Sequence, residues 1–210
     1  MAMLLRHGYN HLGIQELLSA TAVPKGSFYH HFESKEDFAL QVIDRYMVGV
    51  HAGLDACLGD PAVAPLQRVR TFFESTREAY RQEGYLGCLL GGLGQELSGV
   101  NEGFRRRIEK CFQEIAARIT GCLEEAVRRG ELAPDTDARQ LANLLVDCWE
   151  GAALRTRLLR DPAPLQAMLD FYFKSMGGAV ASDARTTRRG TPRGSTRRAG
   201  RVPPSGKRSR

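Results

Sequence analysis

The sequence lacks any apolar run near the roughly 18 residues that a membrane-spanning helix needs, and no secretory cleavage pattern follows Met1. Its five cysteines are an odd number without C-x-x-C spacing, which argues against a disulfide framework and against a zinc site. No segment alternates apolar and polar residues for long enough to predict a strand. These absences argue against a membrane protein and a secreted domain, and they favour a cytoplasmic setting.

The chain has no net positive charge outside its C-terminal end. The formal net charge is +6, but residues 181–210 carry ten lysines and arginines against Asp183 alone, so the rest of the chain is mildly acidic. This end is also rich in Gly, Pro, Ser and Thr, and we expect residues 178–210 to form a disordered basic tail. The tail is either a solvated extension without a role or an arm that binds DNA phosphates regardless of sequence.

Apolar residues recur at helical spacing almost throughout, and 42% of the residues are hydrophobic, enough for a packed core. Glycine and proline mark the helix ends, since proline is tolerated only near helix starts. We predict an all-α protein with an N-terminal unit over residues 1–46 and a larger helical domain over 47–177. The expected longer helices span about 35–58, 64–82, 102–129, 136–159 and 162–176, with a Gly-rich short helix after Gly84.

Two short helices are predicted between Ile14 and Phe32. Leu17 and Leu18 form the buried face of the first, a turn of small residues follows, and Pro24 begins the second. Lysine can pair with phosphate or guanine, hydroxyls can bond phosphate or base edges, and glycine allows close backbone approach. This layout is typical of a helix-turn-helix, although the spacing alone also fits a packing hairpin. The residues expected to be exposed are Lys25, Gly26, Ser27, Tyr29 and His30.

The string VPKGSFYHHFESKEDF, from Val23 to Phe38, closely resembles the signature of tetracycline-repressor (TetR) type regulators. The likeness covers about residues 4–176 and implies an all-α homodimer with a ligand-responsive core. It further implies contacts with double-stranded operator DNA from Lys25, Gly26, Ser27, Tyr29 and His30, and a phosphate contact from Lys35.

The chain departs from the family pattern at two places. The family's first helix is longer, but only Met1 to His7 precede Gly8, so this helix either starts upstream or is trimmed. Leu12-Gly13 stands where the family often has a hydroxyl pair, so one phosphate-contacting hydroxyl is missing, although glycine is an acceptable N-cap.

The last two helices have apolar faces with small residues, which suit a four-helix interface between two subunits. A two-fold dimer predicts a near-palindromic operator, because the symmetry of the protein is mirrored in the half-sites. The residues expected on these faces are Leu144, Cys148, Gly151, Ala152 and Arg155 on one helix and Leu165, Met168, Leu169 and Tyr172 on the next.

A second string, GCLLGGLGQE from Gly87 to Glu96, resembles the family branch that represses reductases of reactive electrophiles such as N-ethylmaleimide and quinones. The resemblance implies that Cys88 is a sensing thiol. Cys88 also stands at an expected helix N-terminus, where the helix dipole favours the thiolate, and Arg157 or Arg81 could stabilise it further. The other interpretation of Cys88 is a small buried apolar residue. Cys111 and Cys122 are expected in the core.

The sequence therefore favours a homodimeric transcriptional repressor that a small-molecule inducer releases from its operator. The inducer is either an electrophile or oxidant that modifies Cys88 or a non-covalent hydrophobic ligand held in the helical bundle. A helical interaction module without specific DNA binding is the alternative from another class. We expect no enzyme, metal or cofactor, because the chain has no nucleophile triad and no metal spacing. The glycines of Gly91-Gly92-x-Gly94 also lack the strand and spacing of a nucleotide loop.

Overall fold

The computed structural model describes residues 1–186, with side chains through Met176, and this part of the chain contains nine α-helices and no strand. The predicted fold class is therefore confirmed. The helices are α1 (Ala2–His11), α2 (Ile14–Thr21), α3 (Lys25–His31), α4 (Lys35–Leu58), α5 (Pro65–Gln82), α6 (Leu89–Leu97), α7 (Glu102–Arg128), α8 (Ala138–Leu159) and α9 (Ala163–Thr186). No described helix is long and apolar enough to cross a membrane.

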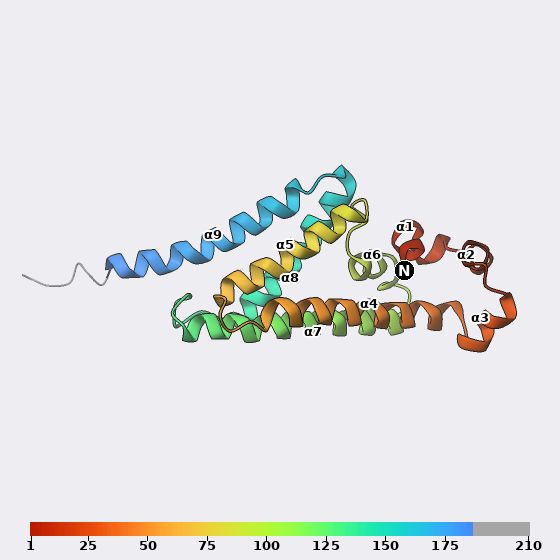
Figure 1. The fold of residues 1–210 in the computed structure, drawn as a ribbon, viewed down its shortest axis with the longest axis horizontal. Coiled ribbons are helices and arrows are strands. Elements are labelled where there is room, and N and C mark those ends of the chain that lie inside the picture. Colours follow the sequence, from red (N-terminus) through yellow and green to blue (C-terminus); the bar gives the residue numbers. More distant parts are fainter. Residues whose placement is uncertain (187–210) are drawn as a thin grey trace, which may run out of the picture.

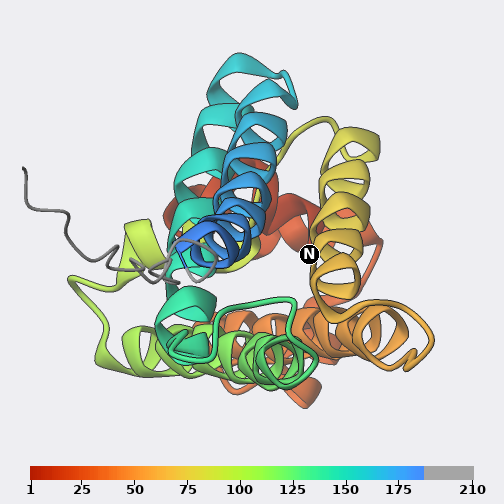
Figure 2. The same ribbon diagram turned by 90° about the vertical axis from the view of Figure 1, so that its left-hand side faces the viewer.

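The helices α1 to α3 gather at one end of an elongated molecule, and α4 runs from this end along the length of the larger domain (Figure 1). Helix α7 packs against α4, α5 and α8, and α9 packs against α8 and α5. In the view along the molecule, α4 and α7 lie side by side at the bottom (Figure 2). Helix α5 lies above them on one side, and the α8–α9 pair lies above them on the other. The short helix α6 packs against α1, α4 and α7, so it connects the N-terminal unit to the larger domain.

Local capping signals explain where the long helices begin. The Ser34 hydroxyl accepts a hydrogen bond from the Asp37 amide at 3.0 Å, and Asn101 and Asp137 cap α7 and α8 in the same way. Such caps satisfy amides that have no partner inside the helix. Pro65 occupies the first turn of α5, where its missing N–H costs nothing.

The core runs the length of the larger domain. Trp149 of α8 lies against Phe73 and Tyr80 of α5, with ring centroids 4.8 and 5.9 Å apart. Phe104 of α7 is completely buried and meets the Tyr9 ring of α1 edge to face at 5.2 Å. Cys111 and Cys122 are buried on α7, which confirms their predicted place in the core.

One predicted helix end is confirmed and one is wrong. The sequence predicts that Gly8 ends the first segment, and the backbone at Gly8 is indeed not helical, with φ 73° and ψ 177°, so α1 consists of two helical segments that meet at this kink. The sequence also predicts that the last helix ends near residue 176, but α9 runs to Thr186, which includes the first residues of the predicted tail. An interior glycine costs a helix only about 1 kcal/mol, so Gly177-Gly178 does not have to end it. The remainder of the predicted tail, residues 187–210, lies outside the described residues.

Candidate functional site

Helices α2 and α3 form the predicted helix-turn-helix. Ala22, which ends α2, has a left-handed backbone with a φ of 52°, and this turns the chain sharply toward α3. Phe28 faces inward and is 3% exposed, with its ring 5.1 Å from Phe32 and 5.6 Å from Phe38. This anchoring leaves the other face of α3 free, and Lys25, Gly26, Ser27, Tyr29 and His30 are all exposed.

Several features of this exposed face suit a nucleic acid. Nothing lies within 4 Å of the position of a Cβ on Gly26, so a ligand backbone can approach closely there. The Tyr29 ring is 48% exposed although large aromatic side chains are usually covered. The Lys35 ammonium, at the start of α4, lies over the Tyr9 ring at 4.4 Å, so this cation is held near the end of α1.

The N-terminal unit is tied to the larger domain by two polar contacts with α1. The Glu96 carboxylate, near the end of α6, accepts hydrogen bonds from the Tyr9 and Asn10 amides at 2.7 and 2.6 Å, directly after the kink at Gly8. A Cβ on Gly8 would clash with this carboxylate. The Arg157 guanidinium of α8 donates to the Leu5 carbonyl at 3.1 Å. Helices α6 and α8 therefore both hold α1.

Replacing Glu96 with alanine is expected to lower the free energy of unfolding by about 1.5–3 kcal/mol, the usual value of hydrogen bonds to a charged group. The two amides after the kink then lose their acceptor. Denaturant titration followed by circular dichroism measures the change. Glu83→Ala is the matched control, because Glu83 is an exposed carboxylate without a hydrogen bond among the described residues. Equal stability of the two variants would contradict the proposed role of Glu96.

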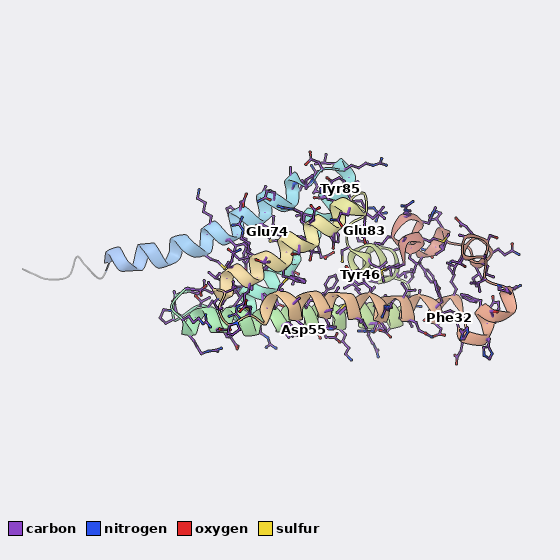
Figure 3. The ribbon with its side chains drawn as sticks, viewed as in Figure 1. Phe32, Tyr46, Asp55, Glu74, Glu83 and Tyr85 are labelled. Atoms are coloured by element: carbon purple, nitrogen blue, oxygen red, sulfur yellow. The ribbon has the colours of Figure 1, made fainter. Side chains whose placement is uncertain are left out.

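Cys88 is the N-cap residue of α6, as the sequence predicts, and it is buried. Its Sγ lies 3.8 Å from the Tyr46 Oη of α4. Figure 3 shows Tyr46 on the side of α4 that faces α6. The thiol borders a cavity of about 620 Å³ among α4, α5, α7 and α8, whose lining includes the aromatic residues Tyr46, Phe72, Phe73, Tyr80, Phe112 and Trp149.

The surroundings of Cys88 oppose the thiolate that its place at a helix N-terminus favours, and its burial fits the other interpretation, a small buried residue. Burial raises the pKa of the Cys88 thiol far above its usual value, and the nearby Glu150 carboxylate raises this pKa further. These two effects outweigh the hydrogen bonds of the Gly91 amide and the Tyr46 hydroxyl, which lower the pKa of the thiol. Neither predicted arginine compensates: Arg157 binds the Leu5 carbonyl, and Arg81 pairs with Glu78 on the surface of α5. The thiol is therefore protonated at neutral pH.

The sequence does not single out Glu150, which lies beside Cys88 and is mostly shielded from solvent. Burial raises the pKa of the Glu150 carboxyl to about 7, against the opposing effect of the Cys88 side chain. Gly91 makes room for this carboxyl, because a Cβ at position 91 would collide with it. This steric need gives a reason for one of the glycines in the Gly-rich segment.

The outer face of α8 and α9 is apolar and exposed. Leu144, Cys148, Gly151 and Arg155 are exposed on α8 as predicted for a subunit interface, and Ala152 and Met168 are half-buried. The sequence analysis expects Leu165, Leu169 and Tyr172 at the subunit interface, and this prediction is wrong. All three are buried in the chain's own core, and the Tyr172 hydroxyl donates to the Leu141 carbonyl at 2.9 Å. The sequence analysis missed exposed apolar side chains on this face, which are Leu154, Leu158, Leu159 and Phe171.

In residues 1–176, whose side chains are described, no group of three or more His, Cys, Asp or Glu residues is arranged to hold a metal ion.

Comparisons with known proteins agree with this architecture. Residues 1–42 match the model of bacterial regulatory proteins of the tetR family, and residues 65–172 match that of a tetracyclin repressor-like C-terminal domain. The chain is 38% identical over 165 residues to transcriptional regulator AcuR of Cereibacter sphaeroides, covering 78% of this chain and 75% of AcuR. It is 30% identical over 168 residues to the transcriptional repressor NemR of Escherichia coli K12, covering 80% of this chain and 84% of NemR.

Solved structures show the same fold. A regulatory protein TetR from Rhodobacter sphaeroides superposes with a TM-score of 0.79 at 36% identity, covering 82% of this chain and 92% of that one. The reduced form of Escherichia coli NemR superposes with a TM-score of 0.74 at 30% identity, covering 81% and 89%. The resemblance noted in the sequence is thereby confirmed. The chain belongs to the TetR family of DNA-binding transcriptional regulators.

Proposed function

We propose that this protein is a homodimeric repressor that binds a near-palindromic operator and releases it when an electrophile or oxidant modifies Cys88. The observation that carries this proposal is the position of α6. Cys88 caps one end of α6, and Glu96 near the other end holds the kinked turn of α1 in the DNA-binding unit. A chemical change at the thiol thus has a short structural route to the helix-turn-helix.

The contacts around Cys88 support this route. The residue is 9% exposed and its Sγ lies 3.8 Å from the Tyr46 Oη, so an adduct on Sγ disturbs this contact even though the rest of the added group can extend into the neighbouring cavity. We expect the start of α6 to move in response, and a helix of nine residues moves as a unit. Displacement of Glu96 and of α1 then changes the separation of the two recognition helices, which must match the spacing of operator half-sites.

The exposed face of α8 and α9 supports the homodimer. Phe171 is 76% exposed and Leu158 is 66% exposed. Large exposed apolar patches usually mark interaction sites. A two-fold axis through this face would place two copies of α3 on successive half-sites, with Lys25, Gly26, Ser27, Tyr29 and His30 directed at DNA.

The test is fluorescence anisotropy on DNA from upstream of the protein's own gene, with non-specific competitor. Near-physiological salt is used because basic segments bind any DNA when salt is low. N-ethylmaleimide or hypochlorite should weaken the specific complex roughly 5–150-fold, the usual range of allosteric coupling. Cys88→Ser should bind equally well and resist both reagents. Release of this variant to the same extent would refute sensing at Cys88, and absence of specific binding would favour a helical interaction module.

A second candidate is a repressor with a non-covalent inducer. The cavity of about 620 Å³ beside Cys88 has the size and the aromatic lining of a small-molecule site. Under this candidate, an apolar ligand releases the wild-type protein and Cys88→Ser equally.

A further inference from the structure

We propose that Glu150 accepts the proton of Cys88 when the thiol adds to a neutral α,β-unsaturated carbonyl compound that has entered the cavity. This inference rests on the proposed function, in which Cys88 is the sensing thiol. It assigns the proton transfer to a residue of α8, 62 positions farther along the chain.

The geometry brings the two groups together from different helices. Glu150 and Cys88 both border the cavity of about 620 Å³, and both also border the cleft among α1, α6 and α8. A Cβ on Gly91 would meet the Glu150 carboxylate and lie 3.8 Å from the Cys88 Cβ, so the two side chains are neighbours at the first turn of α6. Because Gly91 has no Cβ, the carboxyl can lie against the first turn of α6, next to the residue that caps it.

Addition of Cys88 needs such a partner. The thiolate is the nucleophile, but burial keeps this thiol protonated at neutral pH. A general base works best when its own pKa lies near the working pH, and the Glu150 carboxyl, with a pKa of about 7, is partly ionised there.

The titratable and charged groups around Glu150 come from six helices and their caps. Cys88 is its neighbour across Gly91, and the Tyr46 hydroxyl is the next polar group, 3.8 Å from the sulfur. The charged and titratable groups that share a cavity, cleft or groove with Glu150 are the amino group of Met1, Arg6, His7 and His11 of α1, Arg45, Tyr46 and Cys57 of α4, Tyr80 and Glu83 of α5, Cys88 and Glu96 of α6, Glu109 of α7, and Arg139, Asp147 and Arg157 of α8.

The reaction adds S–H across a carbon–carbon double bond and needs no oxidant. Glu150 takes the thiol proton while Sγ forms a bond to the β-carbon, and the π electron pair moves toward the carbonyl as an enolate. The α-carbon then receives the proton from Glu150, which returns to its carboxylate form. The Tyr46 hydroxyl keeps its proton, because burial holds its pKa well above the usual value, so it can donate to the enolate oxygen.

The test is the rate at which N-ethylmaleimide modifies Cys88, followed by mass spectrometry of the Cys88 peptide between about pH 5.5 and 9. In the wild type, the rate should rise with pH and level off above about 7, as Glu150 ionises. Glu150→Gln should react about a hundredfold more slowly at pH 7, the lower range of general-base effects, and lose the plateau. Glu83→Gln, which removes another carboxylate at the same cavity, should match the wild type.

The modification rate of Glu150→Gln can also contradict the proposal. If the carboxylate only repels the thiolate, removing its charge makes Cys88 more acidic, and Glu150→Gln reacts as fast as the wild type or faster, which would overturn the proposal. Gly91→Ala provides a second variant, since it keeps the charge but displaces the carboxyl, and it should also react slowly. An unreactive wild-type thiol would also overturn it.

DNA release separates this inference from the proposed function. Glu150→Gln, once fully modified by long incubation, should leave the operator as the modified wild type does. Retention of DNA by fully modified wild-type protein would refute the proposed function, even if the rate of Cys88 modification depends on Glu150 as proposed.

Discussion

Lys25→Ala is expected to weaken specific operator binding by about 2–6 kcal/mol per dimer, from roughly 1–3 kcal/mol at each of two recognition helices. Lys25 is the first residue of α3, is exposed, and forms no ion pair among the described residues. Its ammonium is therefore free for a base edge or a phosphate. No other residue of α3 carries a permanent positive charge.

Anisotropy titrations at several salt concentrations measure the loss and identify the contact. A phosphate contact would lower affinity for all DNA and reduce the salt dependence, whereas a base contact would lower affinity for the operator alone. Lys110→Ala is the matched control, because Lys110 is an exposed lysine in the middle of α7. Equal operator affinity of Lys25→Ala and the wild type would contradict the assignment of α3 as the recognition helix.

Phe171→Glu is expected to convert the dimer to monomers at micromolar concentration, with the dissociation constant raised about a thousandfold. The side chain lies on the apolar outer face of α9 and is 76% exposed, so the substitution does not disturb the chain's own core. In a two-fold interface the change introduces a carboxylate from each subunit, and juxtaposed like charges cost several kcal/mol. About 4 kcal/mol corresponds to a thousandfold change in affinity.

Sedimentation velocity measures the oligomeric state directly. Val100→Glu is the control, because Val100 is 80% exposed in the connection between α6 and α7, away from α8 and α9. Operator binding should weaken together with dimerisation, since one half-site contact then forms without the other. A stable Phe171→Glu dimer would show that the subunits meet through another face.

Local sequence signals were sufficient for most of the fold. The beginnings of α4, α5 and α7 follow from Ser34, Pro65 and Asn101, because a cap or a proline acts on amides within its own first turn. The exposed face of α3 was also predictable, since Phe28 anchors one side of the helix and the 3.6-residue period directs Lys25 and Tyr29 elsewhere. The family signature lies in the same local segment.

The chemical environment of the Cys88 thiol could not be predicted from local sequence signals. Its position at a helix N-terminus is local and was predicted, and it suggests a thiolate. Tyr46 and Glu150 approach the thiol from helices distant in the sequence, and their packing raises its pKa instead. For the same reason, the periodicity of α9 shows an apolar face at Tyr172 without showing whether a second subunit or α8 covers it.

The sequence by itself determined an all-α chain, the helix-turn-helix and its exposed residues, because these depend on caps, turns and periodicity within a few residues. Only the tertiary structure decided which apolar faces remain outside, how Glu96 and Arg157 hold α1, and that Cys88 is protonated beside Glu150. These properties arise from contacts between helices far apart in the chain, where burial and neighbouring charges outweigh the influence of adjacent residues.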